Sequence, residues 1–238
     1  MKLQNVQFEN WGLVPYLEAR ERQQRLLDEI VAFKRNGQTE FIKHRLIVCA
    51  HPPVFTIGKS GSMDHLLITH QQAEEESIEI HQTNRGGDIT FHGPGQLVVY
   101  PILDLDQLFT DVHRYIRSLE EVIIRVMADY RLQGKRIAAY TGVWLQSGTD
   151  EWRKICAIGV HLSRWVTMHG LAFNISTTLD YFDKIIPCGI QEEGKGVTSL
   201  ERELARAIDR EEVIRKFITH FEEVFEVSII YGKEIKTG

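Results

Sequence analysis

Cys188 is the residue of this sequence whose surroundings best suit covalent chemistry. It lies in the stretch Ile185–Ile190, with Pro187 before it and Gly189 after it. A proline fixes the backbone and a glycine frees it, so we expect a turn that presents the thiol at a fixed angle. Only about 3% of a thiol with a pKa of about 8.5 is ionised at pH 7, and the thiolate is the nucleophile. Cys188 therefore needs a neighbour that lowers its pKa.

Three side chains are candidates for that neighbour. His92 and His169 would act as imidazoles, whereas Lys154 would act as a desolvated amine that lowers the thiol pKa and then moves a proton. Lys154 opens an apolar stretch, where its stem would lie among core residues; a strand-end lysine reaching solvent fits the same pattern. These residues alone leave the choice open. Cys49 and Cys156 lie in apolar strands, and we expect both to be buried and unreactive.

A glycine-rich stretch, Arg85–Gln96, carries the second chemical signal. Four glycines and a proline lie beside an Arg, a Thr, a His and a Gln. Glycine lets the backbone approach a ligand closely, so this pattern predicts a substrate-binding loop rather than a plain turn. The glycine spacing fits neither a P-loop nor a dinucleotide-binding loop, and the Cys and His spacing fits no zinc site. We expect no metal and no cofactor.

The elements that position these residues are strands with interspersed helices, without the regular alternation of a parallel α/β sheet. The apolar patterns predict helices over 15–33 and 112–132 and from Asp209, where Glu212 follows at the capping-box position. They predict strands over 42–49, 54–57, 78–82, 97–103, 142–146, 154–162, 165–175 and 225–231, with a hairpin turn over 147–150. The sequence therefore predicts one domain over 1–238 with an α+β fold, a mixed and mostly antiparallel sheet flanked by helices.

Composition excludes several classes of protein. With 43% hydrophobic and 26% charged residues the chain is ordinary for a globular protein, and a net charge of -5 gives no basic footprint for nucleic acid. No apolar run approaches the roughly 20 residues that span a bilayer, and the first residues lack the apolar core of a signal peptide. An odd number of cysteines, three, makes no disulfide framework. We expect a cytoplasmic protein that binds neither nucleic acid nor membrane.

The sequence resembles the lipoyl(octanoyl) transferase family. The resemblance rests on blocks in the family's order: Arg85-Gly86-Gly87, Thr90-Phe91-His92-Gly93-Pro94-Gly95-Gln96, Tyr100-Pro101, Lys154-Ile155, Ala157–Val160, His169–Asn174, Ile186–Ile190 and Val197–Leu200. They cover most of the chain from about residue 40 to 200. Phe173, where the family often has Leu, is a small departure.

The resemblance implies the fold of the biotin and lipoate protein ligases and an acyltransferase activity. The family takes an octanoyl group from octanoyl-acyl carrier protein and passes it to a lysine of a lipoyl domain, on a 2-oxoacid dehydrogenase E2 subunit or the glycine cleavage H protein. Its nucleophilic cysteine corresponds to Cys188 and its acid/base lysine to Lys154. The residues implied to line the acyl pocket are Arg85, Gly86, Gly87, Asp88, Ile89, Thr90, Phe91, His92, Ala157, Ile158, Gly159, Gly170, Leu171 and Ala172.

Three other functions compete with this one. An ATP-dependent lipoate or biotin protein ligase on the same fold would need no nucleophilic cysteine, and a non-catalytic acyl-binding module would not need Lys154 and Cys188 together. A papain-like pair of Cys188 with His92 or His169 would make Lys154 dispensable. For docking of an acidic carrier protein, the basic candidates are Arg20, Arg22, Arg25, Lys34 and Arg35, although a solvated helix face has the same composition.

Overall fold

A nine-stranded mixed sheet forms the centre of the molecule in the computed structural model, which describes residues 3–138, 140–186 and 194–231. Its order is β12 (Val227–Tyr231), β1 (Gln4–Leu13), β2 (His44–Ala50), β6 (Gln96–Ile102), β10 (Val166–Asn174), β9 (Glu151–Ser163), β8 (Tyr140–Ser147) and β7 (Lys135–Ile137), with β11 (Lys195–Val197) beside β9. Among the described strands of this sheet, only the pairs β12–β1, β1–β2 and β11–β9 are parallel. The expected mixed, mostly antiparallel sheet is confirmed.

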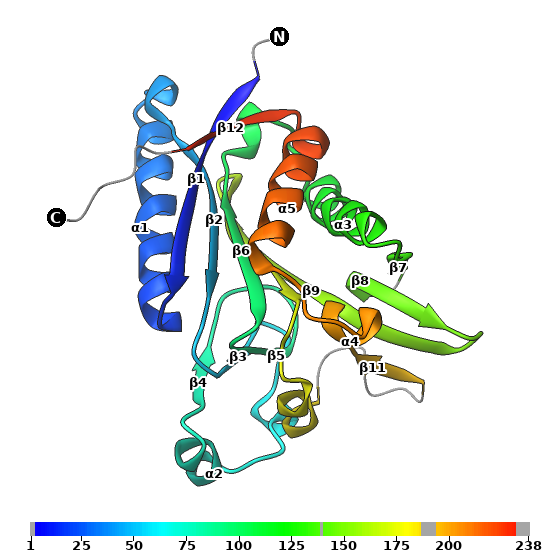
Figure 1. Cartoon of the computed structure of the whole chain (residues 1–238). Helices are drawn as coiled ribbons and strands as arrows, with labels where there is room; N and C mark the ends of the chain where they lie inside the picture. Colours follow the sequence, from blue (N-terminus) through cyan, green and yellow to red (C-terminus); the bar gives the residue numbers. More distant parts are fainter. Residues whose placement is uncertain (1–2, 139, 187–193, 232–238) are drawn as a thin grey trace, which may run out of the picture.

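Helices cover both faces of this sheet (Figure 1). Along β2 and β6 the side chains alternate: Ile47 and Val98 pack toward α1 (Tyr16–Arg35), while Val48 and Val99 pack toward α3 (Val112–Asp129) and α5 (Arg210–Phe225). Both faces of these central strands are thereby buried. The short helices α2 (His70–Glu75) and α4 (Leu200–Leu204) and 3-10 turns at Thr39–Phe41, Met63–His65, Leu105–Gln107 and Leu179–Lys184 complete the helical elements of the described chain.

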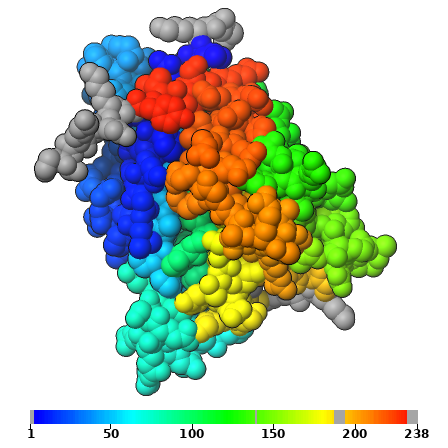
Figure 2. Space-filling view, viewed as in Figure 1, coloured from blue at the N-terminus to red at the C-terminus, as the bar shows by residue number. Residues whose placement is uncertain are grey.

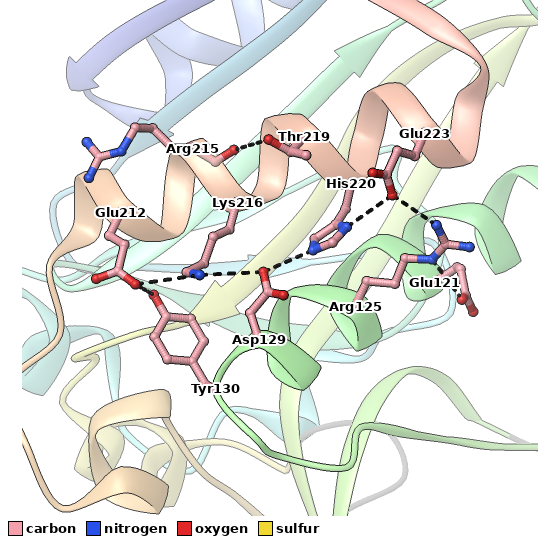
Figure 3. Close-up of polar contacts among 10 residues, drawn as sticks. All are labelled: Glu121, Arg125, Asp129, Tyr130, Glu212, Arg215, Lys216, Thr219, His220 and Glu223. Carbon is pink, nitrogen blue, oxygen red and sulfur yellow. Dashed lines mark hydrogen bonds and ion pairs between the residues drawn. The ribbon is translucent and has the colours of Figure 1, made fainter.

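The helix α3 forms where the apolar stripe predicted it. Leu119, Val122, Ile123, Val126 and Met127 are all fully buried, and Asp111 caps the helix by accepting the backbone N–H of Arg114. The helix α5 packs along α3. Ionic side chains of the two helices also contact one another, as Asp129 of α3 does with Lys216 and His220 of α5 (Figure 3). In the space-filling view, α3 in green and α4 and α5 in orange to red form a continuous surface (Figure 2).

A smaller sheet, which the sequence did not predict, carries the glycine-rich stretch. Its order is β4 (Glu79–Gln82), β3 (Val54–Ile57), β5 (Ile89–His92). The stretch expected to be a loop therefore contains a strand, because Ile89 and Phe91 pair with Ile57 and Phe55 and are buried with them.

Other expectations differ from the structure in detail. The strand β1 was not predicted; only Val6 of its ten residues is buried, so no apolar alternation marks it. Asp209 caps α5 through the N–H of Glu211 rather than in a capping box with Glu212. The turn over 147–150 is confirmed. Among the described residues, no helix has the length and apolar character needed to cross a bilayer.

Candidate active site

A cavity of about 420 Å³ lies between the glycine-rich stretch and strands β9 and β10. This volume is typical of a small-molecule site. The predicted pocket residues that line it are Arg85, Gly86, Gly87, Asp88, Ile89, Thr90, His92, Ala157, Ile158, Gly159, Gly170, Leu171 and Ala172, and Lys154 lines it with them. Phe91 differs: it points to the opposite side of β5 from Thr90 and His92, where it stacks on Tyr181 in a separate core.

The pairing of β9 with β10 explains how two short stretches of sequence meet in this wall. Gly170 is the register partner of Gly159, Leu171 of Ile158, and Ala172 of Ala157. The two predicted triplets are thus three consecutive cross-strand pairs. Gly159 has no room for a side chain, because a Cβ there would lie 2.7 Å from the carbonyl oxygen of Gly86.

The Arg85 side chain holds the glycine-rich stretch in shape. Its guanidinium, in a side chain that is almost fully buried, donates to Thr56 Oγ1 and to the carbonyl oxygens of Thr56, Gly86 and Asp88. The backbone of residues 58–60 adds three hydrogen bonds to the same stretch. These bonds fix the conformation of the cavity wall.

Both candidate histidines are buried and neutral. Burial lowers the pKa of His92 to about 3 and that of His169 to about 3. His92 Nδ1 donates to Gln96 Oε1 over 2.8 Å, and His169 Nε2 lies 2.8 Å from Asn84 Oδ1. An imidazole with such a pKa carries no charge at pH 7, so neither ring offers the positive charge that would lower the pKa of a thiol.

Lys154 lies in β9 at the edge of the cavity. Its Nζ is 4.5 Å from the centre of the ring of Trp144, which is fully buried. A cation over an indole face is stabilised by the ring quadrupole, so this contact orients the ammonium. The main chain is held as well, because the carbonyl of Lys154 accepts the N–H of Thr198 and β11 pairs with Trp152–Lys154. The backbone of Lys154 is therefore fixed within the sheet, and its half-buried side chain lines the cavity.

Cys188 lies outside the described residues, and its role stays a prediction. Phe182 and Val197, which are described, both line the cavity. The other two cysteines are buried and unpaired, as predicted. Burial raises the pKa of Cys49 to about 12 and raises that of Cys156 as well, so neither provides a thiolate at pH 7.

Comparison with known proteins decides the family. The model of the lipoyl protein ligase A/B catalytic domain matches residues 15–222. The chain is 46% identical over 231 residues to an octanoyltransferase of Christiangramia forsetii, covering 95% of this chain and 98% of that protein. It is 47% identical to an octanoyltransferase of Flavobacterium johnsoniae, covering 94% and 98%. The chain belongs to the octanoyltransferase family.

Solved structures place this octanoyltransferase on the lipoate protein ligase fold. A bi-partite lipoate protein ligase from Thermoplasma acidophilum superposes with a TM-score of 0.69 at 15% identity, covering 97% of this chain and 88% of that one. A lipoate-protein ligase A bound with ATP gives a TM-score of 0.66 at 16% identity, covering 98% and 90%. The expected fold is confirmed, and membership in the family makes the chain an acyltransferase of protein lipoylation.

Sequence reasoning did not assign several residues that line the cavity of this octanoyltransferase. They include Tyr16, Gln96, Tyr100, Tyr140, Thr141, Leu162, Asn174 and Phe182. Gln96, Tyr100 and Asn174 stand within the motif blocks, which was a usable signal. Tyr16 and Tyr140 reach the cavity from α1 and β8, and nothing in the local sequence marks them.

Three of the five basic residues considered for carrier-protein docking are engaged within the fold, and one of them, Arg20, donates to the carbonyl of Gln82. Lys34 donates to Asp104, to Asp106 and to the carbonyl of Arg164, and Arg22 pairs with Glu18. These contacts weaken the case for α1 as a docking surface.

Proposed function

We propose that this octanoyltransferase moves an octanoyl group from octanoyl-acyl carrier protein to a lysine of a lipoyl domain through a thioester on Cys188. The acceptors are lipoyl domains of 2-oxoacid dehydrogenase E2 subunits and the glycine cleavage H protein. The observation that supports the proposal most is that Lys154 shares one cavity with the paired apolar wall of β9 and β10.

The first half-reaction forms the acyl-enzyme. The Cys188 thiolate attacks the carbonyl carbon of the carrier thioester, a new C–S bond forms, and the C–S bond to the carrier breaks. Lys154, which has taken the Cys188 proton, gives a proton to the departing carrier thiolate. One thioester replaces another, so the step needs no ATP.

The second half-reaction forms the amide. The neutral amine of the acceptor lysine attacks the Cys188 thioester, a C–N bond forms, and the C–S bond breaks. Lys154 takes the amine proton and returns it to the Cys188 thiolate, which restores the starting state. The enzyme is therefore ready for a second donor without any other reactant.

The cavity accounts for selection of the acyl chain. Burial of about six methylenes contributes ~5 kcal/mol at ~0.8 kcal/mol each. One methylene more or less changes transition-state binding by only ~1–3 kcal/mol, so the preference for octanoyl over its neighbours is real but incomplete.

Transfer by purified variants tests the proposal. The protein is incubated with octanoyl-acyl carrier protein and an apo lipoyl domain without ATP, and the octanoylated domain is measured by mass spectrometry. We expect Cys188→Ala to abolish transfer and Lys154→Met to lower it by about two orders of magnitude or more. Cys49→Ala is the matched control, because its thiol is buried and protonated, and it should keep the wild-type rate.

Two outcomes would contradict the proposal. Undiminished transfer by Cys188→Ala would exclude the thioester. Transfer that requires free octanoate and ATP would indicate a ligase of the same fold.

A further inference from the structure

The regular alternation of β9 breaks next to Lys154. Ile155 and Cys156 are consecutive, yet both are fully buried in the same core beneath α3 and α5. The register shows the cause: Val143 pairs with Cys156, and the next residue, Trp144, pairs with Lys154. One extra residue of β9 thus lies between two adjacent pairs, which is a β-bulge.

This bulge decides which way Lys154 points. Val143 and Leu145 face the core, so Trp144 between them faces the other side of the sheet. Lys154 is the partner of Trp144 and lies over its ring. In a regular strand Lys154 would share the face of Cys156, two residues away, and would enter the apolar core. The bulge therefore turns Lys154 away from the core and to the cavity.

Gly142 packs against the bulge on the neighbouring strand. Its φ is +118°, a conformation that favours glycine, and a Cβ there would overlap the carbonyl oxygen of Cys156. Gly142 directly follows Tyr140 and Thr141, which line the cavity. Gly142 therefore contacts the bulge on one side and directly follows the cavity-lining residues in the chain.

Glu120 of α3 holds Gly142 in place. Its side chain is fully buried, and Oε1 accepts the backbone N–H of Gly142 over 3.0 Å. Oε2 accepts from Arg117 over 2.7 Å and from Arg136 over 3.1 Å. Burying a carboxylate is costly unless it is paired and hydrogen-bonded, and here two arginines and a backbone N–H meet that need.

We infer that Glu120 is a positioning residue for Lys154. It acts through Gly142 and the β-bulge, and so directs the lysine side chain to the cavity. The inference rests on the proposed function, because it takes Lys154 as the group that activates Cys188. Glu120 itself does not line the cavity.

The reactivity of Cys188 toward iodoacetamide at pH 7 tests this inference without depending on turnover. The alkylation rate follows the thiolate fraction, and peptide mass spectrometry separates Cys188 from the buried Cys49 and Cys156. We expect both Lys154→Met and Glu120→Ala to lower the rate, each by about tenfold. The double variant should be no slower than Lys154→Met, because residues that act in series are not additive.

Three further variants separate positioning from a general structural effect. Glu120→Gln keeps an oxygen that accepts from Gly142, so it should restore the rate to within about threefold of wild type. Glu121→Gln is the matched control: it lies on the same helix and its carboxylate binds Arg125 and Arg136, so the alkylation rate should not change. Gly142→Ala disturbs the bulge directly. If Glu120→Ala does not fold, Gly142→Ala takes its place, and its alkylation rate is compared alone and in combination with Lys154→Met.

The outcomes distinguish a failure of the role inferred for Glu120 from a failure of the role proposed for Lys154. If Lys154→Met leaves Cys188 as reactive as wild type, the proposed role of Lys154 fails and the inference fails with it. If Lys154→Met is slow but the effect of Glu120→Ala adds to it in full, or if Glu121→Gln slows alkylation as much as Glu120→Ala, the inference alone is wrong.

Discussion

The backbone N–H of Gly86 donates to the carbonyl oxygen of Val160 over 2.9 Å. This bond joins the glycine-rich stretch of the smaller sheet to the part of β9 that extends beyond its pairing with β8. Both sheets therefore contribute to the cavity wall, and we expect the width of the cavity to depend on the residues at this junction.

A methyl group at Gly86 should narrow the cavity without disturbing the junction. A Cβ there would meet its nearest neighbour, the carbonyl oxygen of Val160, at 3.5 Å, an ordinary contact distance. We expect Gly86→Ala to fold with nearly wild-type stability and to shift the preference from octanoyl toward shorter chains by ~1–3 kcal/mol in relative kcat/KM. Transfer rates with hexanoyl, octanoyl and decanoyl carrier proteins measure this.

Gly159→Ala is the informative contrast. Its Cβ would lie 2.7 Å from the carbonyl oxygen of Gly86, so the wall must shift, at a cost of ~1–3 kcal/mol in the free energy of unfolding. If Gly86→Ala transfers hexanoyl, octanoyl and decanoyl groups in the same ratios as the wild type, the wall at Gly86 does not belong to an acyl pocket.

The buried histidines make the stability of the protein depend on pH. Burial lowers the pKa of His51 to about 4 and those of His92 and His169 to about 3, from 6.5. Between pH 6.5 and pH 5 the unfolded chain therefore binds protons that the folded chain does not. The free energy of unfolding should fall with falling pH over this range, by up to ~1.4 kcal/mol per pH unit for each histidine.

Urea unfolding at several pH values between 7.5 and 5 measures this slope. His92→Gln removes one of these groups, so its slope should be shallower even if the variant is less stable throughout. A free energy of unfolding that stays constant, or that rises as the pH falls, would show that these rings are protonated in the folded protein.

Sequence patterns predicted the elements that carry a strong apolar period. The helix α3 buries residues at the spacing that the pattern requires. The strands β9 and β10, predicted from apolar runs, bring the two predicted triplets together. The motif blocks located most of the cavity wall, because most of the lining residues occur together in short stretches of chain.

Other features depend on partners that are distant in sequence. The strand β1 is defined by its neighbours β2 and β12 rather than by its own apolar pattern, and Tyr16 reaches the cavity through the packing of α1. In the sequence the bulge at Ile155 is indistinguishable from a regular apolar strand, because Ile155 is followed by further apolar residues, from Cys156 to Ile158. Its contacts are with residues of other elements, since Gly142 packs against it and Glu120 accepts the N–H of Gly142.

The ionic contacts between α3 and α5 should affect stability and leave transfer unchanged. Asp129 at the end of α3 accepts from His220 Nε2 over 3.0 Å and lies 3.6 Å from Lys216 Nζ, both on α5 (Figure 3). These groups are partly exposed, so we expect Asp129→Ala to lower the free energy of unfolding by only ~0.5–1 kcal/mol, and by less at high salt. Urea unfolding at low and high salt measures the change. A variant with a normal fold and a slower transfer rate would contradict this separation.

The acyl-enzyme is the most direct test of the central claim. The protein is incubated with octanoyl-acyl carrier protein alone, without ATP or acceptor, and its mass is then measured intact and after digestion. We predict one octanoyl group on Cys188, which disappears when an apo lipoyl domain is added and does not form in Cys188→Ala. Transfer to the lipoyl domain with no acyl group on Cys188, or with the acyl group on another residue, would contradict the account.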